Sequence, residues 1–363
     1  MTTDLLREVN LLGTCHGIVI ADSYAGQLCS QVLHTMRRSL RVASLLVSTL
    51  IPGLFQAASA QGTAQTFPVK TIRLVVPFPP GAGTDSIARL IAQKLGESME
   101  AKVIVDNRVG AGGAIGAVEV ARADPDGYTL LFVASPFTTV AASSRSAGYD
   151  PVKQFLPVAP IASGPLAFVV NTNVPAKTMR EFIALARAQP NKLNYGSAGP
   201  GSVNHLALEL LNARAGIDIV HVPYKGIAPA TQDLLSGQIQ AMTASIPATL
   251  PYLAQNRVRV LAVTGPRRAA LLPDVPTWRE AGIENAEVIN YWGIVAPLGT
   301  PRDVVAKLNA EVTKILALPD VRERLEREGA ELIPGSPERL GALIETDLIS
   351  WKKLITEARL QLD

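Results

Sequence analysis

Two glycine-rich turns carry most of the residues that could bind a ligand. The first lies in LVVPFPPGAGTDSIAR, residues 74–89, where an apolar run ends in a Pro/Gly turn and Thr84 and Asp85 open a segment of helical spacing. Backbone N–H groups at a helix start have no intrahelical partner, and the helix dipole adds about half a positive charge there. Such a turn can bind a carboxylate or phosphate without a cationic side chain. An ordinary connection between a strand and a helix explains the same residues equally well.

The same arrangement recurs at residues 193–211. Residues 193–195 have the pattern of a strand, GSAGPGS covers 196–202, and an apolar helix continues to Leu211. Ser202 could be the N-cap of this helix or a donor to a ligand, and both readings stay open. The glycines at 110, 112, 113 and 116 miss the G-x-G-x-x-G spacing, so the sequence does not favour a dinucleotide site.

The other polar candidates are few. We interpret His205 as a helix-end hydrogen-bonding residue and His221, within a strand, as structural. Lys225 could give a cation to a distal carboxylate or be a solvated turn residue. Ser135 and Thr138 could line the wall of a site or belong to a plain strand-end turn.

These turns need a sheet to position them. Strands at 72–76, 103–105 and 128–134 alternate with helices at about 85–95 and up to about 123, which predicts a parallel doubly wound sheet. Further strands at 193–195, 217–222, 239–243 and 258–263 predict a second sheet. Residues 155–170 and 289–296 are expected to cross between the two, and the helical C-terminal region is expected to pack on the first.

The N-terminal region predicts export. Met36-Arg37-Arg38 and Arg41 form a basic segment, residues 42–55 are an apolar run of 14, and Ala58-Ser59-Ala60 is a small-x-small cleavage site. We expect a signal peptide cleaved after Ala60, with Met36 as the natural start, so that 1–60 is an upstream extension plus leader. A long n-region is the alternative. A membrane span needs about 20 residues, so we expect a periplasmic protein that does not span the membrane.

Composition excludes several classes. Of the 363 residues, both cysteines (Cys15, Cys29) fall before residue 61, and only His205 and His221 remain among the four histidines. We therefore expect no disulfide, no metal and no cofactor. Removing four basic and three acidic residues from a net charge of +3 leaves +2, which predicts no nucleic-acid binding. Without G-x-S-x-G or a thiol we expect no enzyme, although a carboxylate pair for acid/base work stays open.

Seven spaced motifs together resemble one family. They are PFPPGAGTD (77–85), VDNRVGAGGAIG (105–116), DPDGYTLL (124–131), NYGSAGPGSVNHLALEL (194–210), HVPYKGIAPATQDLLSGQI (221–239), RVLAVTG (259–265) and LPDVPTWREAG (272–282). This set is similar to the Bug-type solute-binding proteins of tripartite tricarboxylate transporters, in order, over essentially the whole mature chain.

The resemblance implies a type II periplasmic-binding-protein fold, a Venus flytrap of two doubly wound α/β lobes joined by two hinge crossings around a ligand cleft. Lobe 1 would comprise 66–165 and 291–363, and lobe 2 would comprise 166–290. The implied function is to capture a small organic carboxylate and deliver it to the membrane permease subunits of such a transporter. We expect a monomer. The alternatives are a ligand-loaded sensor that docks on a membrane receptor, and an exported enzyme acting on a carboxylic acid.

Carried over by position, the resemblance implies ligand contacts from both glycine loops. The residues are Phe78, Gly81, Ala82, Gly83, Thr84 and Asp85 in the first lobe, with Ser135 as a wall candidate, and Ser197, Ala198, Gly199 and Ser202 in the second, with Lys225 as a weaker candidate. We expect Asp85 to be a helix cap that holds the loop, because a bare carboxylate would repel an anionic ligand. We expect Trp292 to pack the hinge.

Two departures from the family pattern bear on the ligand. Many relatives have Gly-Gly-Gly where this chain has Gly81-Ala82-Gly83. Relatives often carry an aspartate where this chain runs Met242-Thr243-Ala244-Ser245, so a counter-charge for an α-ammonium group is missing. The sequence therefore favours a plain mono- or dicarboxylate over an amino acid.

Overall fold

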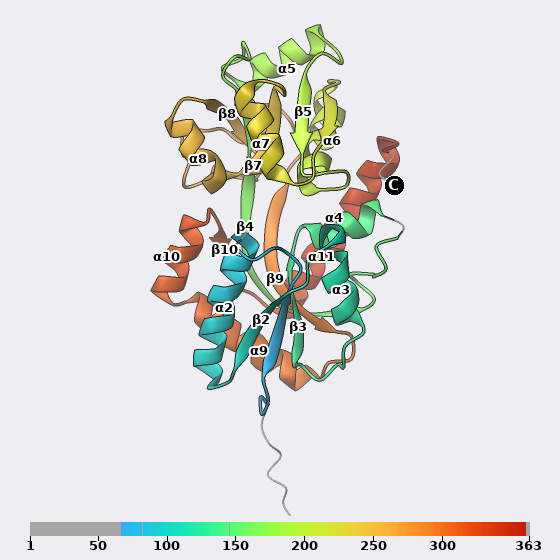
Figure 1. Cartoon of the computed structure of the whole chain (residues 1–363), viewed down its shortest axis with the longest axis vertical. Helices are drawn as coiled ribbons and strands as arrows, with labels where there is room; N and C mark the ends of the chain where they lie inside the picture. Colours follow the sequence, from blue (N-terminus) through green and yellow to red (C-terminus); the bar gives the residue numbers. More distant parts are fainter. Residues whose placement is uncertain (1–66, 82, 145, 361–363) are drawn as a thin grey trace, which may run out of the picture. The chain divides into compact units, whose positions relative to one another are not determined.

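The computed structural model of this chain describes residues 67–81, 83–144 and 146–360. The predicted signal peptide, both cysteines and Ala82 lie outside the described residues. In Figure 1 the described chain forms two halves, and strands β4 (Phe155–Asn171) and β9 (Ile289–Pro297) run between them.

The sheet of the first half is built around three parallel strands. These are β1 (Ile72–Val76), β2 (Val103–Asn107) and β3 (Thr129–Ala134), and the order is β2-β1-β3-β9-β4. β9 is antiparallel to β3, and β4 is antiparallel to β9. The two-residue strand β10 (Glu331–Leu332), which sequence analysis missed, pairs with β4.

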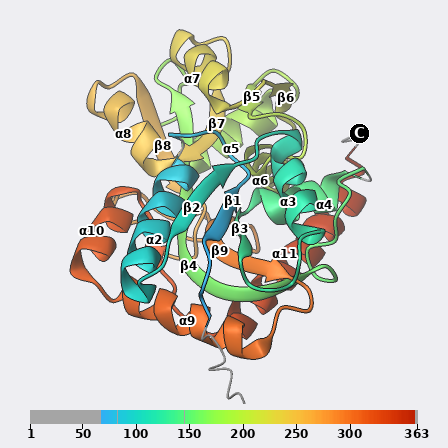
Figure 2. The same cartoon turned by 60° about the horizontal axis from the view of Figure 1, so that its bottom comes forward.

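Both faces of this sheet are buried, which explains its apolar strands. Leu74 contributes to the core on one face and Val75 to the core on the other. The first face is covered by α2 (Gly83–Met99), α9 (Arg302–Leu316) and α10 (Pro319–Arg327). The second is covered by α3 (Ala114–Ala121), which follows the short helix η1 (Ala111–Gly113), by α4 (Pro136–Ser143) and by α11 (Pro337–Glu357). Figure 2 shows this layering.

The second half repeats the design. Its parallel strands are β5 (Asn194–Ser197), β6 (Val220–Pro223) and β7 (Ala241–Ser245), and β8 (Val258–Val263) pairs with β4. Helices α5 (Met179–Ala188) and α6 (Val203–Ala215) pack on one face. Helices α7 (Ile227–Ser236) and α8 (Ile246–Ala254) pack on the other.

Strand β4 joins the two sheets. Its residues up to Pro165 pair with β9, and from Leu166 onward they pair with β7. This chain path confirms the predicted α/β class with two lobes and two crossings. We call the half that contains β1 the first lobe and the half that contains β5 the second lobe.

Three predicted elements differ from the structure. Residues after Ser135 form helix α4 and not merely a strand-end turn, because Pro136 sits at its first turn and Phe137 is buried in the core. Helix α2 runs from Gly83 to Met99, beyond the predicted 85–95. The last helix does not pack on the first sheet alone, because its Trp351 and Leu354 lie in the core of the second lobe. No helix among the described residues has the length and hydropathy to cross a membrane.

Candidate functional site

Asp85 is at the centre of the first glycine loop. It is the third residue of α2, and it is 1% exposed. Its Oδ2 accepts from the backbone N–H of Gly81 (2.9 Å) and from Nε of Arg89 (2.8 Å), and its Oδ1 accepts from Nδ2 of Asn107 (2.8 Å). Burial opposes ionisation, but the hydrogen bonds from Arg89, Asn107 and Gly81 outweigh it and hold the pKa of Asp85 below the usual 3.8. Asp85 therefore holds the loop as an ionised residue of the first helical turn, and it is not the N-cap.

Asn107, the last residue of β2, ties the loop to the neighbouring strand. Its Nδ2 also donates to the Phe78 carbonyl (2.9 Å), and its Oδ1 accepts from Nη2 of Arg89 (2.8 Å). Asn107 and Arg89 were not among the site residues predicted from the sequence. The available signal was position, because β1 and β2 are parallel and Val76 lies opposite Asn107, so a polar residue at that strand end must meet the turn after β1.

The other residues of the first glycine loop differ in how exposed they are to solvent. Gly81 and Gly83 are exposed, whereas Phe78 is half-buried and packs on the core of the first lobe. Gly81 has φ +81°, a conformation that favours glycine, and a Cβ there would meet no atom within 4 Å. The backbone at Gly81 and Gly83 is thus open to a ligand.

Thr84 is anchored to the hinge strand. Its Oγ1 accepts a hydrogen bond from Nε1 of Trp292 on β9 (3.1 Å), and Trp292 is 8% exposed. Because the indole is a donor only, the Thr84 hydroxyl keeps its own proton for another partner. Trp292 packs the hinge, as expected, and also orients Thr84 as a donor.

Replacing Thr84 by valine should lower the free energy of unfolding by about 1–2 kcal/mol, because the nearly buried indole N–H loses its acceptor. Thr84→Ser keeps the hydroxyl and should stay close to the wild type. Urea unfolding followed by tryptophan fluorescence measures both. A Thr84→Val protein as stable as the wild type would show that this hydrogen bond does not contribute to stability.

Ser135 is committed to the protein. Its Oγ donates to the Ile289 carbonyl (3.2 Å) and accepts from the Tyr291 N–H (3.2 Å), so the hydroxyl pins the end of β3 to the start of β9. The side chain is 1% exposed. These contacts favour the strand-end reading of Ser135 over a ligand wall.

The second glycine loop is closed by its own serines. Ser202 is the N-cap of α6: its Oγ accepts from the His205 N–H (3.3 Å) and donates to the Gly199 carbonyl (2.7 Å). Ser197 Oγ accepts from the Gly199 N–H (3.0 Å). The structure thus places Ser202 as the N-cap, and Gly199 faces inward with both polar backbone groups. Gly199 has φ +124°, and a Cβ there would lie 3.3 Å from the Tyr224 carbonyl.

The two histidines lie behind this loop. His205 Nδ1 accepts from the Gly201 N–H (3.1 Å), and His221 Nε2 lies 2.7 Å from Ser197 Oγ. Burial lowers the pKa of each to about 4, with the other imidazole adding to the shift at His205. Both are structural at neutral pH, as the sequence suggested.

The turn that carries Lys225 rests on the same loop. The Tyr224 N–H donates to the Ser197 carbonyl (3.2 Å), and the Gly226 N–H donates to the Ala198 carbonyl (3.3 Å). The Lys225 side chain is exposed, and no acceptor for its ammonium group occurs among the described residues. Lys225 is therefore next to the loop and can offer a cation there.

Helix starts gather at one edge of each sheet. Helices α2, α3 and α4 follow the carboxyl ends of β1, β2 and β3, and α6, α7 and α8 follow β5, β6 and β7. Because the strands of each set are parallel, the N-terminal N–H groups of each set meet at the same edge. The combined dipoles make both edges suited to an anion.

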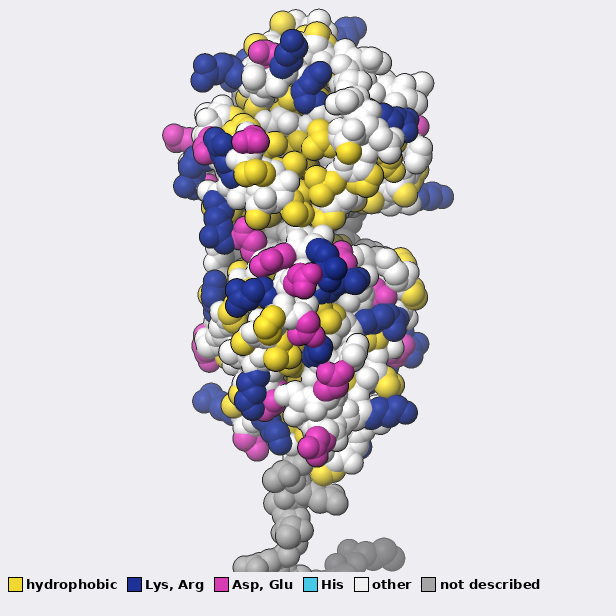
Figure 3. All heavy atoms as spheres, turned by 90° about the vertical axis from the view of Figure 1, so that its left-hand side faces the viewer, with side chains coloured by type: hydrophobic (Ala, Val, Ile, Leu, Met, Phe, Trp, Pro, Cys, Tyr) yellow, Lys and Arg dark blue, Asp and Glu magenta, His cyan; other side chains and the backbone are white. Residues whose placement is uncertain are grey.

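The side view in Figure 3 shows the surface hollowed at one margin between the two lobes, with hydrophobic side chains along the lower border of the upper lobe. No group of three potential metal ligands occurs in the described part of the chain. What the two glycine loops offer a ligand is backbone N–H donors, hydroxyls and apolar surface.

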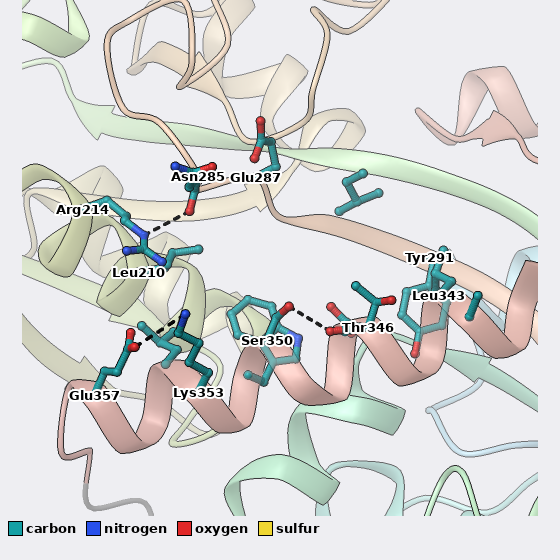
Figure 4. Close-up of a pocket in the computed structure, with 15 residues that line it drawn as sticks. Leu210, Arg214, Asn285, Glu287, Tyr291, Leu343, Thr346, Ser350, Lys353 and Glu357 are labelled. Carbon is teal, nitrogen blue, oxygen red and sulfur yellow. Dashed lines mark hydrogen bonds and ion pairs between the residues drawn. The ribbon is translucent and has the colours of Figure 1, made fainter.

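A separate pocket of about 670 Å³ lies between α6, residues 285–291 and α11 (Figure 4). None of the predicted ligand residues lines it. It contains Asp347, whose pKa burial raises to about 6 although a hydrogen bond from Thr138 opposes the shift. Tyr291, from the hinge strand, also lines the pocket, and its hydroxyl donates to the same Thr138 (3.3 Å).

Comparison with known proteins decides the family. The sequence profile described as Tripartite tricarboxylate transporter family receptor matches residues 87–360. The chain belongs to this family. The match includes both hinge strands and the second glycine loop of the receptor.

Three relatives of the receptor illustrate the family. BugT of Bordetella pertussis (strain Tohama I) is 32% identical over 324 residues, which cover 89% of this chain and 98% of BugT. Rpa4515 of R. palustris with adipate is 36% identical with a TM-score of 0.73, covering 80% of this chain and 98% of that one. MatC (Rpa3494) from Rhodopseudomonas palustris with bound malate is 35% identical with a TM-score of 0.70, covering 80% and 100%. The Bug-type resemblance and the binding-protein fold are thereby confirmed.

Proposed function

We propose that this receptor captures a small organic carboxylate, a mono- or dicarboxylate, between its lobes in the periplasm and delivers it to the permease of a tripartite tricarboxylate transporter. The observation that carries the proposal is the pair of glycine loops, each at a helix start and each held by its own polar network around Asp85 or the two histidines. Adipate and malate in two related structures support the ligand class.

In this proposal the lobes, 66–165 with 291–363 and 166–290, close as rigid bodies about β4 and β9. Ligand contacts with both loops would stabilise the closed form. The leader would be removed after Ala60, and the mature protein would act as a monomer. The ligand would contact Gly81, Gly83 and Thr84 in the first lobe.

The second lobe supports a ligand without an ammonium group. Thr243 is fully buried, and its carbonyl and Oγ1 accept from Nδ2 of Asn204 (2.7 and 3.3 Å). Ala244 is buried beside it. The described residues at this strand end, Thr243, Ala244 and Ser245, carry no carboxylate to balance an ammonium group, so a plain acid fits better.

A thermal-shift panel of mono-, di- and tricarboxylates tests capture. The full-length gene should be expressed with its leader, and the exported protein freed of bound ligand before the screen. An acid at about a hundred times its dissociation constant should add about 2.7 kcal/mol, which is several degrees. If no carboxylate in the panel moves the midpoint, the proposal is wrong.

Gly81→Ala should reduce affinity for that acid by about tenfold, equivalent to about 1.4 kcal/mol, because the positive φ of the loop disfavours a Cβ. Gly216, the αL C-cap of α6 with φ +59°, is the matched control, since a Cβ at either glycine meets nothing within 4 Å. Both alanine variants should lose about 1 kcal/mol of stability. Isothermal titration should show the affinity loss only for Gly81→Ala; an equal loss in Gly216→Ala would contradict a specific role for the loop.

Delivery needs its own test. The loaded receptor should co-purify with the membrane subunits of a tripartite tricarboxylate transporter, and the ligand-free receptor should do so more weakly. If the membrane subunits bind the loaded and the ligand-free receptor equally well, simple docking is favoured over delivery.

A further inference from the structure

Three aromatic rings stack behind the second glycine loop. Tyr195 comes from β5, His221 from β6 and His205 from α6. The two imidazole centroids are 3.8 Å apart with planes inclined by 15°, and the Tyr195 centroid is 5.0 Å from that of His221. The stack brings together two titratable rings from neighbouring elements that the sequence separates by 16 positions.

Each imidazole controls one backbone N–H of the loop. His205 Nδ1 accepts directly from Gly201, so at this geometry Nδ1 carries no proton. His221 acts through Ser197, whose Oγ accepts from Gly199. Two N–H groups of the loop are thus turned inward, which sets the direction of the neighbouring donors at the start of α6.

A proton on His205 would disrupt its contact with the loop. A protonated Nδ1 of His205 is a donor and would oppose the Gly201 N–H. Charge on both stacked rings would also be repulsive at this separation. The groups that face the pair are Tyr195, whose hydroxyl donates to Glu209 Oε1 (2.5 Å), and Glu209 itself, 3.9 Å from His205 Nε2.

The burial of the neighbouring groups agrees with a neutral pair. Burial is the main cause that raises the pKa of Glu209, and burial and the nearby Glu209 raise that of Tyr195 above its ordinary value. At His205, burial disfavours the charged imidazole despite the nearby Glu209 carboxyl. Both histidines titrate near pH 4, as described above.

We infer that His205 and His221 are positioning residues for carboxylate capture: as neutral imidazoles they fix the second glycine loop in its ligand-binding form, and protonation of His205 releases the loop and weakens binding. The inference rests on the proposed function. It assigns the pair a role in affinity beyond holding the fold together.

The variants His205→Asn and His221→Gln test this role. The Asn amide oxygen stands near the position of Nδ1 and the Gln amide near that of Nε2, so each can keep the contact without titrating. His205→Leu removes the acceptor and keeps an apolar side chain. Adipate and malate are the probes, measured by isothermal titration from pH 7.5 to pH 4.

At pH 7.5 we expect His205→Asn to bind within about threefold of the wild type and His205→Leu about tenfold more weakly. Between pH 7 and pH 4 the wild type should lose about two- to fivefold more affinity than the Asn/Gln double variant. Protonation of the probe weakens its binding to the wild type and to the double variant equally, so it cancels in the ratio of the two affinities. A constant ratio across the range, or equal affinity of His205→Leu and the wild type, would overturn the inference.

A ligand-free readout keeps the two proposals distinguishable. By NMR, the Gly199 and Gly201 amides of the wild type should shift with the titration of the two imidazoles, and in the double variant they should not. If the chemical shifts of these amides do not follow the titration of the histidines, the positioning role is wrong even if both acids bind. A different outcome is that neither probe binds the wild type at pH 7.5, while the amide chemical shifts still follow the titration of the histidines. That result would count against carboxylate capture, but it would establish that the histidines hold the loop.

Discussion

Asp85→Ala should cost about 2–4 kcal/mol of unfolding free energy and abolish carboxylate binding at concentrations that saturate the wild type. The carboxylate is almost fully buried and accepts three hydrogen bonds, from Gly81, Arg89 and Asn107. Removing it leaves the Gly81 N–H without its acceptor, and the Asn107 amide keeps only the Phe78 carbonyl as an acceptor. The start of α2 then loses its direct hydrogen bond to the end of β2.

Two further variants sharpen this prediction. Asp85→Asn keeps an oxygen for Gly81 but loses the charge that pairs with Arg89, so its loss of stability should be intermediate. Asp320→Ala breaks an exposed pair with Lys94 (2.7 Å) and should change stability by at most about 0.5 kcal/mol. Urea unfolding and ligand titration of the three variants are the measurements. Full ligand affinity in a folded Asp85→Ala protein would contradict the account of the loop.

Asp347→Asn should stabilise the protein at pH 7.5 by about 2 kcal/mol, because burial makes the ionised carboxyl costly. Its pKa of about 6 in the folded protein exceeds the ordinary 3.8. The folded state therefore holds this proton more tightly than the unfolded state does. The resulting stability is fully present below about pH 3.8 and is lost as the pH rises through about 6.

The pH dependence identifies the cause. The advantage of Asp347→Asn should be large above pH 7 and should vanish towards pH 4, and urea unfolding at three pH values measures it. Glu345→Gln on the exposed side of α11 is the control, and it should show no such trend. A gain from Asp347→Asn that is equal at all pH values would show that burial of the charge is not the source.

The two histidines change the stability with pH in the direction opposite to that of Asp347. Because the folded-state pKa values of His205 and His221 lie below the ordinary 6.5, the unfolded state binds protons first as the pH falls. Stability from these residues is complete above about pH 6.5 and declines towards pH 4. Asp347 and the histidine pair therefore tilt the stability profile in opposite directions over the same range.

Local patterns in the sequence predicted the frame of the fold well. Leu74, Val75 and Val76 are apolar on consecutive positions because both faces of the sheet are covered, and the Pro/Gly turn after them marks the helix start. The crossing near residues 155–170 was also visible as a long apolar segment. These features depend on neighbours in the chain.

Contacts between segments that are far apart in the sequence were harder to predict. Asn107 meets Asp85 only because β2 lies beside β1, and Trp351 reaches the second lobe only because α11 is long enough to leave the first. Helix α4 was missed because Pro136 also fits a turn. The pairing of His205 with His221 likewise follows from strand order, which a single sequence does not state.

The most direct test of carboxylate capture is a crystal structure with the acid that gives the largest thermal shift. We expect a carboxylate group within hydrogen-bond distance of backbone N–H groups or hydroxyls at the starts of α2 and α6, next to Gly83, Thr84 and Ser202. An acid bound instead in the pocket between α6 and α11 (Figure 4), with both glycine loops unoccupied, would contradict this expectation.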